Sequence, residues 1–179
     1  MAKLINNHLR NGYSDYNLLF LKRHVKELNL NNKILDVGCG HYRNLYLFYQ
    51  LGFKNLYGID MLPPDPSEKP EDFKVNFIQK DITTGLPYED KSFEIVLCNF
   101  VLMFVPLESL INAIEELLRV TKVFCIIETQ KQHYEAKNGQ MKLYDFKNII
   151  SIIESNDEFE IIDKKLYKEK LIVRRKNIG

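Results

Sequence analysis

The sequence predicts an α/β fold in which a mostly parallel sheet carries helices on both faces. Apolar, strand-like runs alternate along the chain with amphipathic helical patterns, and this alternation is typical of such sheets. Two of the apolar runs end in an acidic residue, Asp36 and Asp60, and the first leads into the glycine-rich turn Gly38-Cys39-Gly40. The length of 179 residues, without an internal repeat or a low-complexity tract, suits a single domain.

The first half of the chain contains the elements around this turn. Residues 16–28 place their apolar side chains on one helical face, and a strand is predicted at 33–37. A helix over 44–51 leads to a second strand at 55–60. Four of the six prolines lie within residues 61–74, so the crossover helix usual at this point should be absent or one turn long.

The second half continues the alternation. Its clearest element is the helix predicted over 107–120, where leucine and isoleucine side chains share one face. The other elements are strands at 75–80, 93–98 and 123–129, a helix at 145–154, and closing strands at 158–167 and 171–175.

The glycine-rich turn and the acid that follows it indicate a nucleotide-type site. In parallel sheets, glycines at a strand end let the backbone approach a ligand, and an acid about 20 residues later can hold ribose hydroxyls. A dinucleotide site would need a third glycine at the position of Arg43, which is far too large for that role. The ligand is therefore expected to lack a pyrophosphate, and a nicotinamide-dependent oxidoreductase is disfavoured.

The segment Asp36-Val37-Gly38-Cys39-Gly40, with Asp60 closing the next strand, resembles the first two motifs of class I S-adenosylmethionine (SAM)-dependent methyltransferases. The resemblance covers residues 32–129. It implies a single-domain, doubly wound, mostly parallel seven-stranded sheet with an antiparallel last strand. One departure is Tyr42, which stands where many members have a third glycine.

The resemblance also implies SAM as cofactor and a role for each strand end. The residues expected to bind SAM are Asp36, Gly38, Cys39, Gly40, Asp60, Met61, Asp81, Ile82 and Asn99. Asp36 would order the amino group of SAM or a nearby water, and Asp60 would accept hydrogen bonds from both ribose hydroxyls. Asp81 would take the adenine amino group, Ile82 would pack on the ring, and Asn99 would lie near the transferred methyl. Alternatively, Asp36 and Asp81 only cap turns, Asp60 begins a loop, and Asn99 is an ordinary strand-end residue.

Methyl transfer from SAM requires little acid–base catalysis by the protein, because the sulfonium methyl group is already electrophilic. The stretch Leu102-Met103-Phe104-Val105-Pro106, where many relatives carry histidines, holds no titratable group. This favours an acceptor that is already nucleophilic. His133 is the leading candidate for a catalytic base, and His41 is a weaker one. Tyr13 and Tyr16 are candidate lid residues over the cofactor, or packing residues at a helix start.

The composition limits the partners. The net charge is +1, with 45% hydrophobic and 27% charged residues, so a strong attraction to nucleic acid is not expected. The basic residues within 164–176 are interpreted as the charged face of an edge strand pair, or alternatively as a phosphate-gripping hairpin. No signal-peptide or membrane-spanning pattern is present in the sequence, so a cytoplasmic location without a membrane partner is expected. The three cysteines lack metal or disulfide spacing, and buried thiols are expected.

These observations predict a methyltransferase that passes the SAM methyl group to a small-molecule acceptor by in-line displacement. Two alternatives stay open: a non-catalytic SAM-binding partner subunit, and a protein or nucleic-acid methyltransferase that needs a partner for recognition. Within the domain, residues 1–31 would form an N-terminal helical cap and 32–129 the SAM-binding core. Residues 130–179 would supply a substrate-side loop, a helix and the closing strands. The sequence predicts neither the identity of the acceptor nor the oligomeric state.

Overall fold

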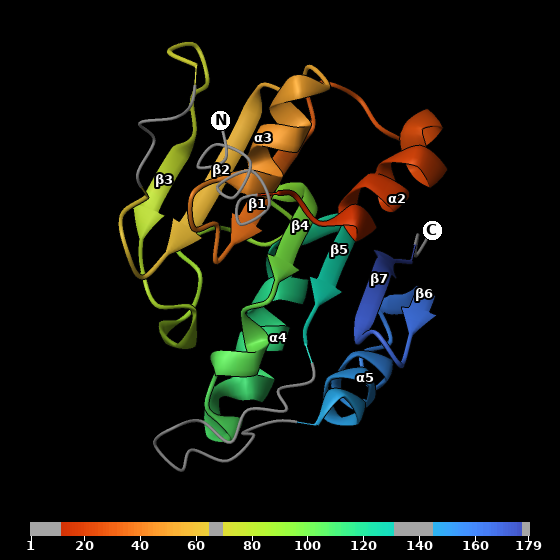
Figure 1. Ribbon diagram of the computed structural model, residues 1–179. Helices are drawn as coiled ribbons and strands as arrows, with labels where there is room; N and C mark the ends of the chain where they lie inside the picture. Colours follow the sequence, from red (N-terminus) through yellow and green to blue (C-terminus); the bar gives the residue numbers. More distant parts are fainter. Residues whose placement is uncertain (1–11, 65–69, 131–144, 177–179) are drawn as a thin grey trace.

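The computed structural model describes residues 12–64, 70–130 and 145–176, which form a seven-stranded sheet in the order β3-β2-β1-β4-β5-β7-β6 (Figure 1). The strands are β1 (Lys33–Val37), β2 (Asn55–Asp60), β3 (Asn76–Gln79), β4 (Phe93–Asn99), β5 (Thr121–Glu128), β6 (Phe159–Lys165) and β7 (Lys170–Arg175). The pairs among β1 to β5 are parallel, whereas β7 lies between β5 and β6 and runs antiparallel to both. The predicted fold class, with its reversed last strand, is confirmed.

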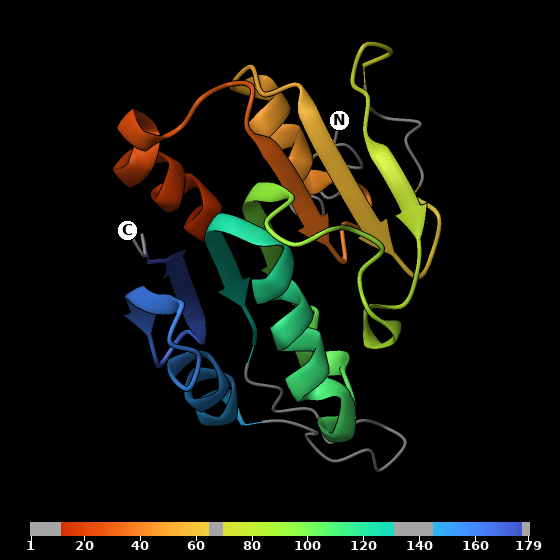
Figure 2. The same ribbon diagram turned by 180° about the vertical axis from the view of Figure 1, so that it is seen from behind.

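Helices cover both faces of the sheet. They are α2 (Asp15–His24), α3 (Arg43–Gln50), α4 (Leu107–Val120) and α5 (Phe146–Glu154), with the short 3-10 turns η1 (Val25–Glu27), η2 (Ile82–Thr84) and η3 (Leu102–Phe104). In Figure 2, α4 lies in front of the sheet and α3 behind it. The described residues between β2 and β3 contain no helix, as the prolines predicted, and the helix predicted over 16–28 is divided into α2 and η1.

Two hydrophobic cores follow from the alternation of side chains along the central strands. In β4, Ile95 and Leu97 pack with α2 and α3, while Val96 and Cys98 pack with α4 and α5. All four side chains are fully buried. A strand buried on both faces reads as a continuous apolar run, which is why the sequence marks it so clearly. All three cysteines are free, buried thiols, as expected.

The strand order places a ligand crevice at one edge of the sheet. The chain moves outward from β1 through β2 to β3 on one side, and from β4 to β5 on the other. In open α/β sheets, ligands bind outside the carboxyl ends of the strands where this order reverses. The crevice is therefore expected between the carboxyl ends of β1 and β4.

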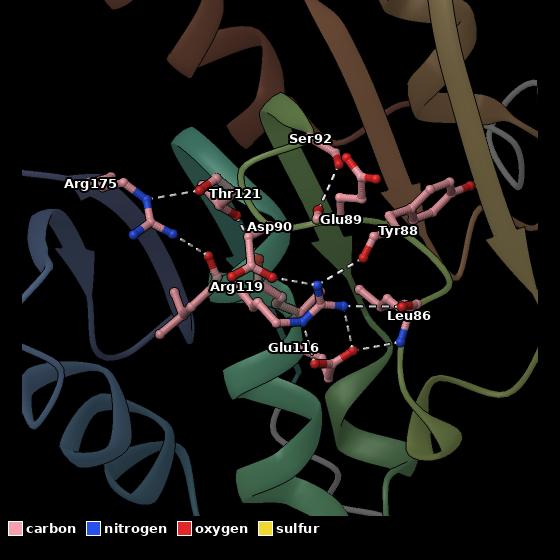
Figure 3. Close-up of polar contacts among 11 residues, drawn as sticks. Leu86, Tyr88, Glu89, Asp90, Ser92, Glu116, Arg119, Thr121 and Arg175 are labelled. Atoms are coloured by element: carbon pink, nitrogen blue, oxygen red, sulfur yellow. Dashed lines mark hydrogen bonds and ion pairs between the residues drawn. The ribbon is translucent and has the colours of Figure 1, made fainter.

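The opposite edge is held by two arginines (Figure 3). Helix α4 passes into β5 with no residue between them, so the last helical carbonyls need partners from elsewhere. Arg175 in β7 donates to the carbonyls of Leu118 and Thr121, both at 2.9 Å. Arg119 pairs with Asp90 at 2.8 Å and also donates to two carbonyls in the segment before β4. These contacts fix the amino end of β5, which is the end away from the expected ligand crevice.

The basic residues of the closing hairpin are largely neutralised. Five of them form ion pairs: Lys164 with Glu154, Lys165 with Asp163, Lys170 with Glu128, Arg174 with Glu27, and Arg175 with Glu158. This pairing supports the interpretation of a charged face on an edge strand pair. None of the helices within the described ranges is long and apolar enough to cross a membrane.

Candidate functional site

The turn between β1 and α3 brings two glycines to the carboxyl edge of the sheet. The N–H groups of Gly38 and Cys39 donate to the carbonyl of Ile59 in β2, at 2.7 and 3.0 Å. Gly38 and Gly40 have φ values of +76° and +47°, a region that favours glycine. A Cβ on Gly38 would lie 2.0 Å from a methyl carbon of Val101, whereas one on Gly40 would meet no described atom within 4 Å. Internal packing therefore requires Gly38, while Gly40 faces space that a ligand can use.

Tyr42 adopts the left-handed conformation that a third glycine would take, with φ of 61°. Its buried ring makes edge-to-face contacts with Phe73 and Phe77, at centroid distances of 5.9 and 6.3 Å. Room for the ring comes from Gly58 in β2, where an added Cβ would lie 3.3 Å from a ring carbon. The left-handed backbone costs about 1–2 kcal/mol, which aromatic burial offsets. The departure from the glycine pattern therefore keeps the backbone shape of the turn.

Two carboxylates stand at strand ends beside the turn. Asp60 accepts hydrogen bonds from the backbone N–H of Gly40 at 2.9 Å and from that of Leu62 at 3.0 Å, each on a different oxygen. Asp81 caps η2 by accepting from the N–H of Thr83 at 2.8 Å. A carboxylate oxygen has more than one acceptor site, so these local bonds orient both groups and leave capacity for a ligand. Turn capping and ligand binding are thus compatible at both positions.

A pocket of about 690 Å³ opens at this edge and is partly lined by these residues. The sequence-predicted site residues that line it are Gly38, Asp60, Met61, Asp81 and Ile82. The opposite wall comes from the segment after β4 and includes Phe100, Val101 and Phe104. Phe100 has a φ of 62°, and such conformations in residues other than glycine cluster at ligand sites.

Asp36 directly precedes the pocket residues Val37 and Gly38 in the chain, and its side chain is 0% exposed. Neither carboxylate oxygen has a hydrogen-bond partner among the described residues. Burial raises the pKa of Asp36 to about 7, although the charge of Arg43 and the amide of Asn44 act in the opposite direction. A buried acid without a partner is costly. A cationic group of a ligand would pair with this carboxylate, which would explain why a buried acid stands at this position.

Arg43 was not predicted as a site residue, yet it begins α3 directly beside this acid. Its guanidinium lies 5.4 Å from the ring centre of Phe100, a pocket residue, and it forms no ion pair with the described part of the chain. The residue before it, Tyr42, gives the helix no side-chain cap. An uncapped helix start with an arginine attracts a carboxylate. The turn thus presents an acid and a cation side by side.

Two predicted residues point away from the pocket or are occupied by other partners. The Cys39 sulfur packs toward Gly58, and burial raises the pKa of its thiol. Asn99 is buried, and its amide bonds Asn17, Asn44 and Glu128. Glu128 itself was missed, although a carboxylate that closes an apolar strand is the same signal that identified Asp36.

The structure describes three of the four candidate lid and base residues. Tyr13 is exposed at 40% near the start of α2. Tyr16 is buried and donates its hydroxyl to Asp163 at 2.6 Å, which supports the packing alternative rather than a lid. His41 is exposed in the glycine turn. His133, the leading candidate for a catalytic base, lies outside the described residues.

A doubly wound sheet with a glycine turn and acids at its carboxyl edge defines a nucleotide-type ligand-binding protein. Residues 35–125, slightly more than half of the 179-residue chain, match the methyltransferase domain family. The chain belongs to this family, within the class I, Rossmann-like methyltransferases, and the cofactor of that class is SAM.

Solved structures confirm the fold at low sequence identity. Magnesium protoporphyrin IX methyltransferase from Synechocystis PCC 6803, solved with bound SAM, is 20% identical with a TM-score of 0.64, covering 90% of this chain and 79% of its own. The 4+2 cyclase SpnF is 16% identical with a TM-score of 0.68, covering 92% and 81%. Phosphoethanolamine N-methyltransferase 1 from Haemonchus contortus is 11% identical with a TM-score of 0.67, covering 84% of this chain and 41% of its own. No curated protein sequence matches the chain.

Proposed function

We propose that this protein is a SAM-dependent methyltransferase that acts on a small-molecule acceptor, with a cytoplasmic location. The observation that carries the cofactor assignment is the buried, unpartnered carboxylate of Asp36 beside the uncapped start of α3 and Arg43. An ammonium and a carboxylate on one carbon, as in the methionyl part of SAM, complement this pair of charges. A pyrophosphate would meet the charge of Asp36, so a dinucleotide fits the turn less well.

The other end of the pocket suits the nucleoside. Asp60 is held by the Gly40 N–H and would accept hydrogen bonds from the ribose hydroxyls. Asp81 and Ile82, which also line the pocket, would take the adenine amino group and ring face, and Met61 is a further lining residue. Gly38, Cys39 and Asn99 would support the site from within the chain.

Bound SAM supplies an electrophilic methyl group, so the protein has to orient the acceptor and exclude water. The described residues from 100 to 106 offer no titratable side chain to this end of the pocket. We therefore expect an acceptor that is already nucleophilic, and His133 is the base to test if a proton must leave. The paired lysines and arginines of the closing hairpin leave little free basic surface for nucleic acid. The porphyrin and phosphoethanolamine enzymes of similar fold are named for small acceptors.

Calorimetry tests the cofactor, and product detection tests the reaction. SAM and S-adenosylhomocysteine should bind with a Kd of about 1 μM, corresponding to about 8 kcal/mol, while NADH should not bind. Incubation with SAM and a panel of nucleophilic metabolites should release S-adenosylhomocysteine with one of them. Binding of NADH without binding of SAM would refute the cofactor assignment. SAM binding without turnover on any tested acceptor would favour a non-catalytic SAM-binding subunit.

A further inference from the structure

A buried glutamate at the end of β5 holds several partners at the carboxyl edge of the sheet. The Glu128 side chain is 2% exposed. One carboxylate oxygen accepts from the Asn99 side-chain amide at 3.1 Å and from the hydroxyl of Ser14, and the other pairs with the Lys170 ammonium. A carboxylate this deeply buried is strongly destabilising when its partners are removed, so the contacts are held firmly.

Glu128 decides which way two asparagine side chains point. A carboxylate only accepts, so the NH₂ group of Asn99 must face it, and the oxygen of Asn99 must face away. That oxygen accepts from the amide of Asn17 at 3.1 Å and from the amide of Asn44 at 3.4 Å. The oxygen of Asn44 is then left to accept the backbone N–H of Ser14 at 3.0 Å. One buried charge thus sets donor and acceptor directions along the whole chain of hydrogen bonds.

This chain of hydrogen bonds reaches the first turn of α3, next to the glycine turn. Asn44 follows Arg43 in the first turn of α3, and its side-chain amide lies close enough to Asp36 to lower the pKa of that carboxyl group without forming a hydrogen bond to it. The backbone carbonyl of Glu128 also accepts the N–H of Phe100 at 2.6 Å. Phe100 lines the pocket and lies beneath the Arg43 guanidinium. Glu128 therefore supports Phe100 in the pocket wall and Asn44 beside the glycine turn without lining the pocket itself.

We infer that Glu128 is a positioning residue, which orients through Asn99 and Asn44 the groups that bind the amino-acid end of the cofactor. The inference rests on the proposed function, because it assigns Glu128 to the SAM site. A buried ion pair such as Glu128–Lys170 can be purely structural, or it can position ligand-binding groups. A purely structural pair would change stability and affect all ligands alike, whereas a positioning residue affects one part of one ligand.

The test compares two ligands in two matched variants. S-adenosylhomocysteine carries the amino acid, and 5′-methylthioadenosine shares its adenosine and thioether but lacks the amino acid. Glu128→Gln should weaken S-adenosylhomocysteine about tenfold and change 5′-methylthioadenosine by less than about twofold in calorimetry. The control is Glu169→Gln, the same substitution in a buried glutamate that accepts from the Thr129 hydroxyl at 3.0 Å. It should leave both affinities within about twofold of the wild type.

Each outcome decides the matter. Equal weakening of both ligands, or no weakening of either in a folded Glu128→Gln variant, would overturn the positioning role while leaving the proposed function intact. A wild-type protein that binds neither SAM nor S-adenosylhomocysteine would refute the proposed function, and the inference with it. If Glu128→Gln does not fold, the double variant Glu128→Gln/Lys170→Met removes the unpaired ammonium, and it should show the same ligand-specific loss.

Discussion

Protonation of Asp36 should control how tightly the amino-acid end of the cofactor binds. Burial raises the pKa of this carboxyl group to about 7, so it is mostly protonated at pH 6 and mostly ionised at pH 8. A ligand ammonium favours the ionised form, and binding below pH 7 should therefore release a proton. If only the carboxylate binds, the ionised fraction rises from about 0.1 to about 0.9 between these pH values, and S-adenosylhomocysteine should bind about tenfold more tightly at pH 8.

Calorimetry at pH 6, 7 and 8, in buffers of different ionisation enthalpy, would measure both the affinity and the released proton. Asp36→Asn should remove the pH dependence, and 5′-methylthioadenosine, which lacks the ammonium, should show none in the wild type. His41→Gln, a substitution in the same turn that leaves Asp36 in place, is the matched control, and it should keep the dependence. An affinity for S-adenosylhomocysteine that is flat across this range in the wild type would refute the role assigned to Asp36.

The same group has a consequence for the free protein. The pKa of Asp36 in the folded state, about 7, lies above the value of about 3.9 expected for an unfolded chain. Between these values the folded state binds more protons than the unfolded state. Its contribution to stability is therefore lost as pH rises, by about 4 kcal/mol at most. Urea unfolding of the wild type and of Asp36→Asn between about pH 4 and pH 7 should show this dependence in the wild type alone.

Four further substitutions test the site and its support. Asp60→Asn should weaken S-adenosylhomocysteine by about 10- to 100-fold in calorimetry, because only one acceptor oxygen then remains for the N–H groups of Gly40 and Leu62 and the charge that would face the ribose is lost; unchanged affinity in a folded variant would remove Asp60 from the site. Gly38→Ala should lower the free energy of unfolding by about 2–4 kcal/mol, since its Cβ would meet Val101, whereas Gly40→Val should cost about 1–2 kcal/mol and abolish ligand binding. Denaturant unfolding that ranks these two variants in reverse would contradict the geometry. Arg175→Met should cost about 2–3 kcal/mol by leaving two carbonyls unpaired, with ligand affinity unaltered at temperatures where it is folded; a loss of affinity there would show that the amino end of β5 is coupled to the site.

The bounds of the helices and strands were predictable where residues typical of turns or strand ends mark them. β1, β2 and α4 lie at the predicted bounds, because acids, glycines or a proline mark their ends. The start of β5 was predicted two residues late, at 123 rather than Thr121, because α4 runs into it without a turn residue. The helix over 16–28 was predicted from its apolar spacing, but the α-helical part ends at His24, and the last turn is of the 3-10 type.

The site was predictable from strand ends but not from side-chain direction. The rule that acids close strands at the ligand edge predicted Asp60 and Asp81 at one edge of the sheet, and both line the same pocket. That rule cannot show that Asn99 is bonded to Asn17, because this contact depends on how α2 packs against the sheet. The role of Arg43 likewise could not be predicted from the sequence, because it depends on the turn that brings its guanidinium beside the buried Asp36.

The closing hairpin makes the folding unit longer than the recognisable family segment. The family match ends at residue 125, yet β7 supplies Lys170 to the buried Glu128 and Arg175 to the end of α4. A fragment that stops after β5 would present an unpaired strand edge together with a buried, uncompensated carboxylate. Exposed edges of this kind pair with other chains, so such a fragment should aggregate on expression rather than fold. Boundaries chosen for an expression fragment should therefore follow the ion pairs of the hairpin rather than the extent of sequence similarity.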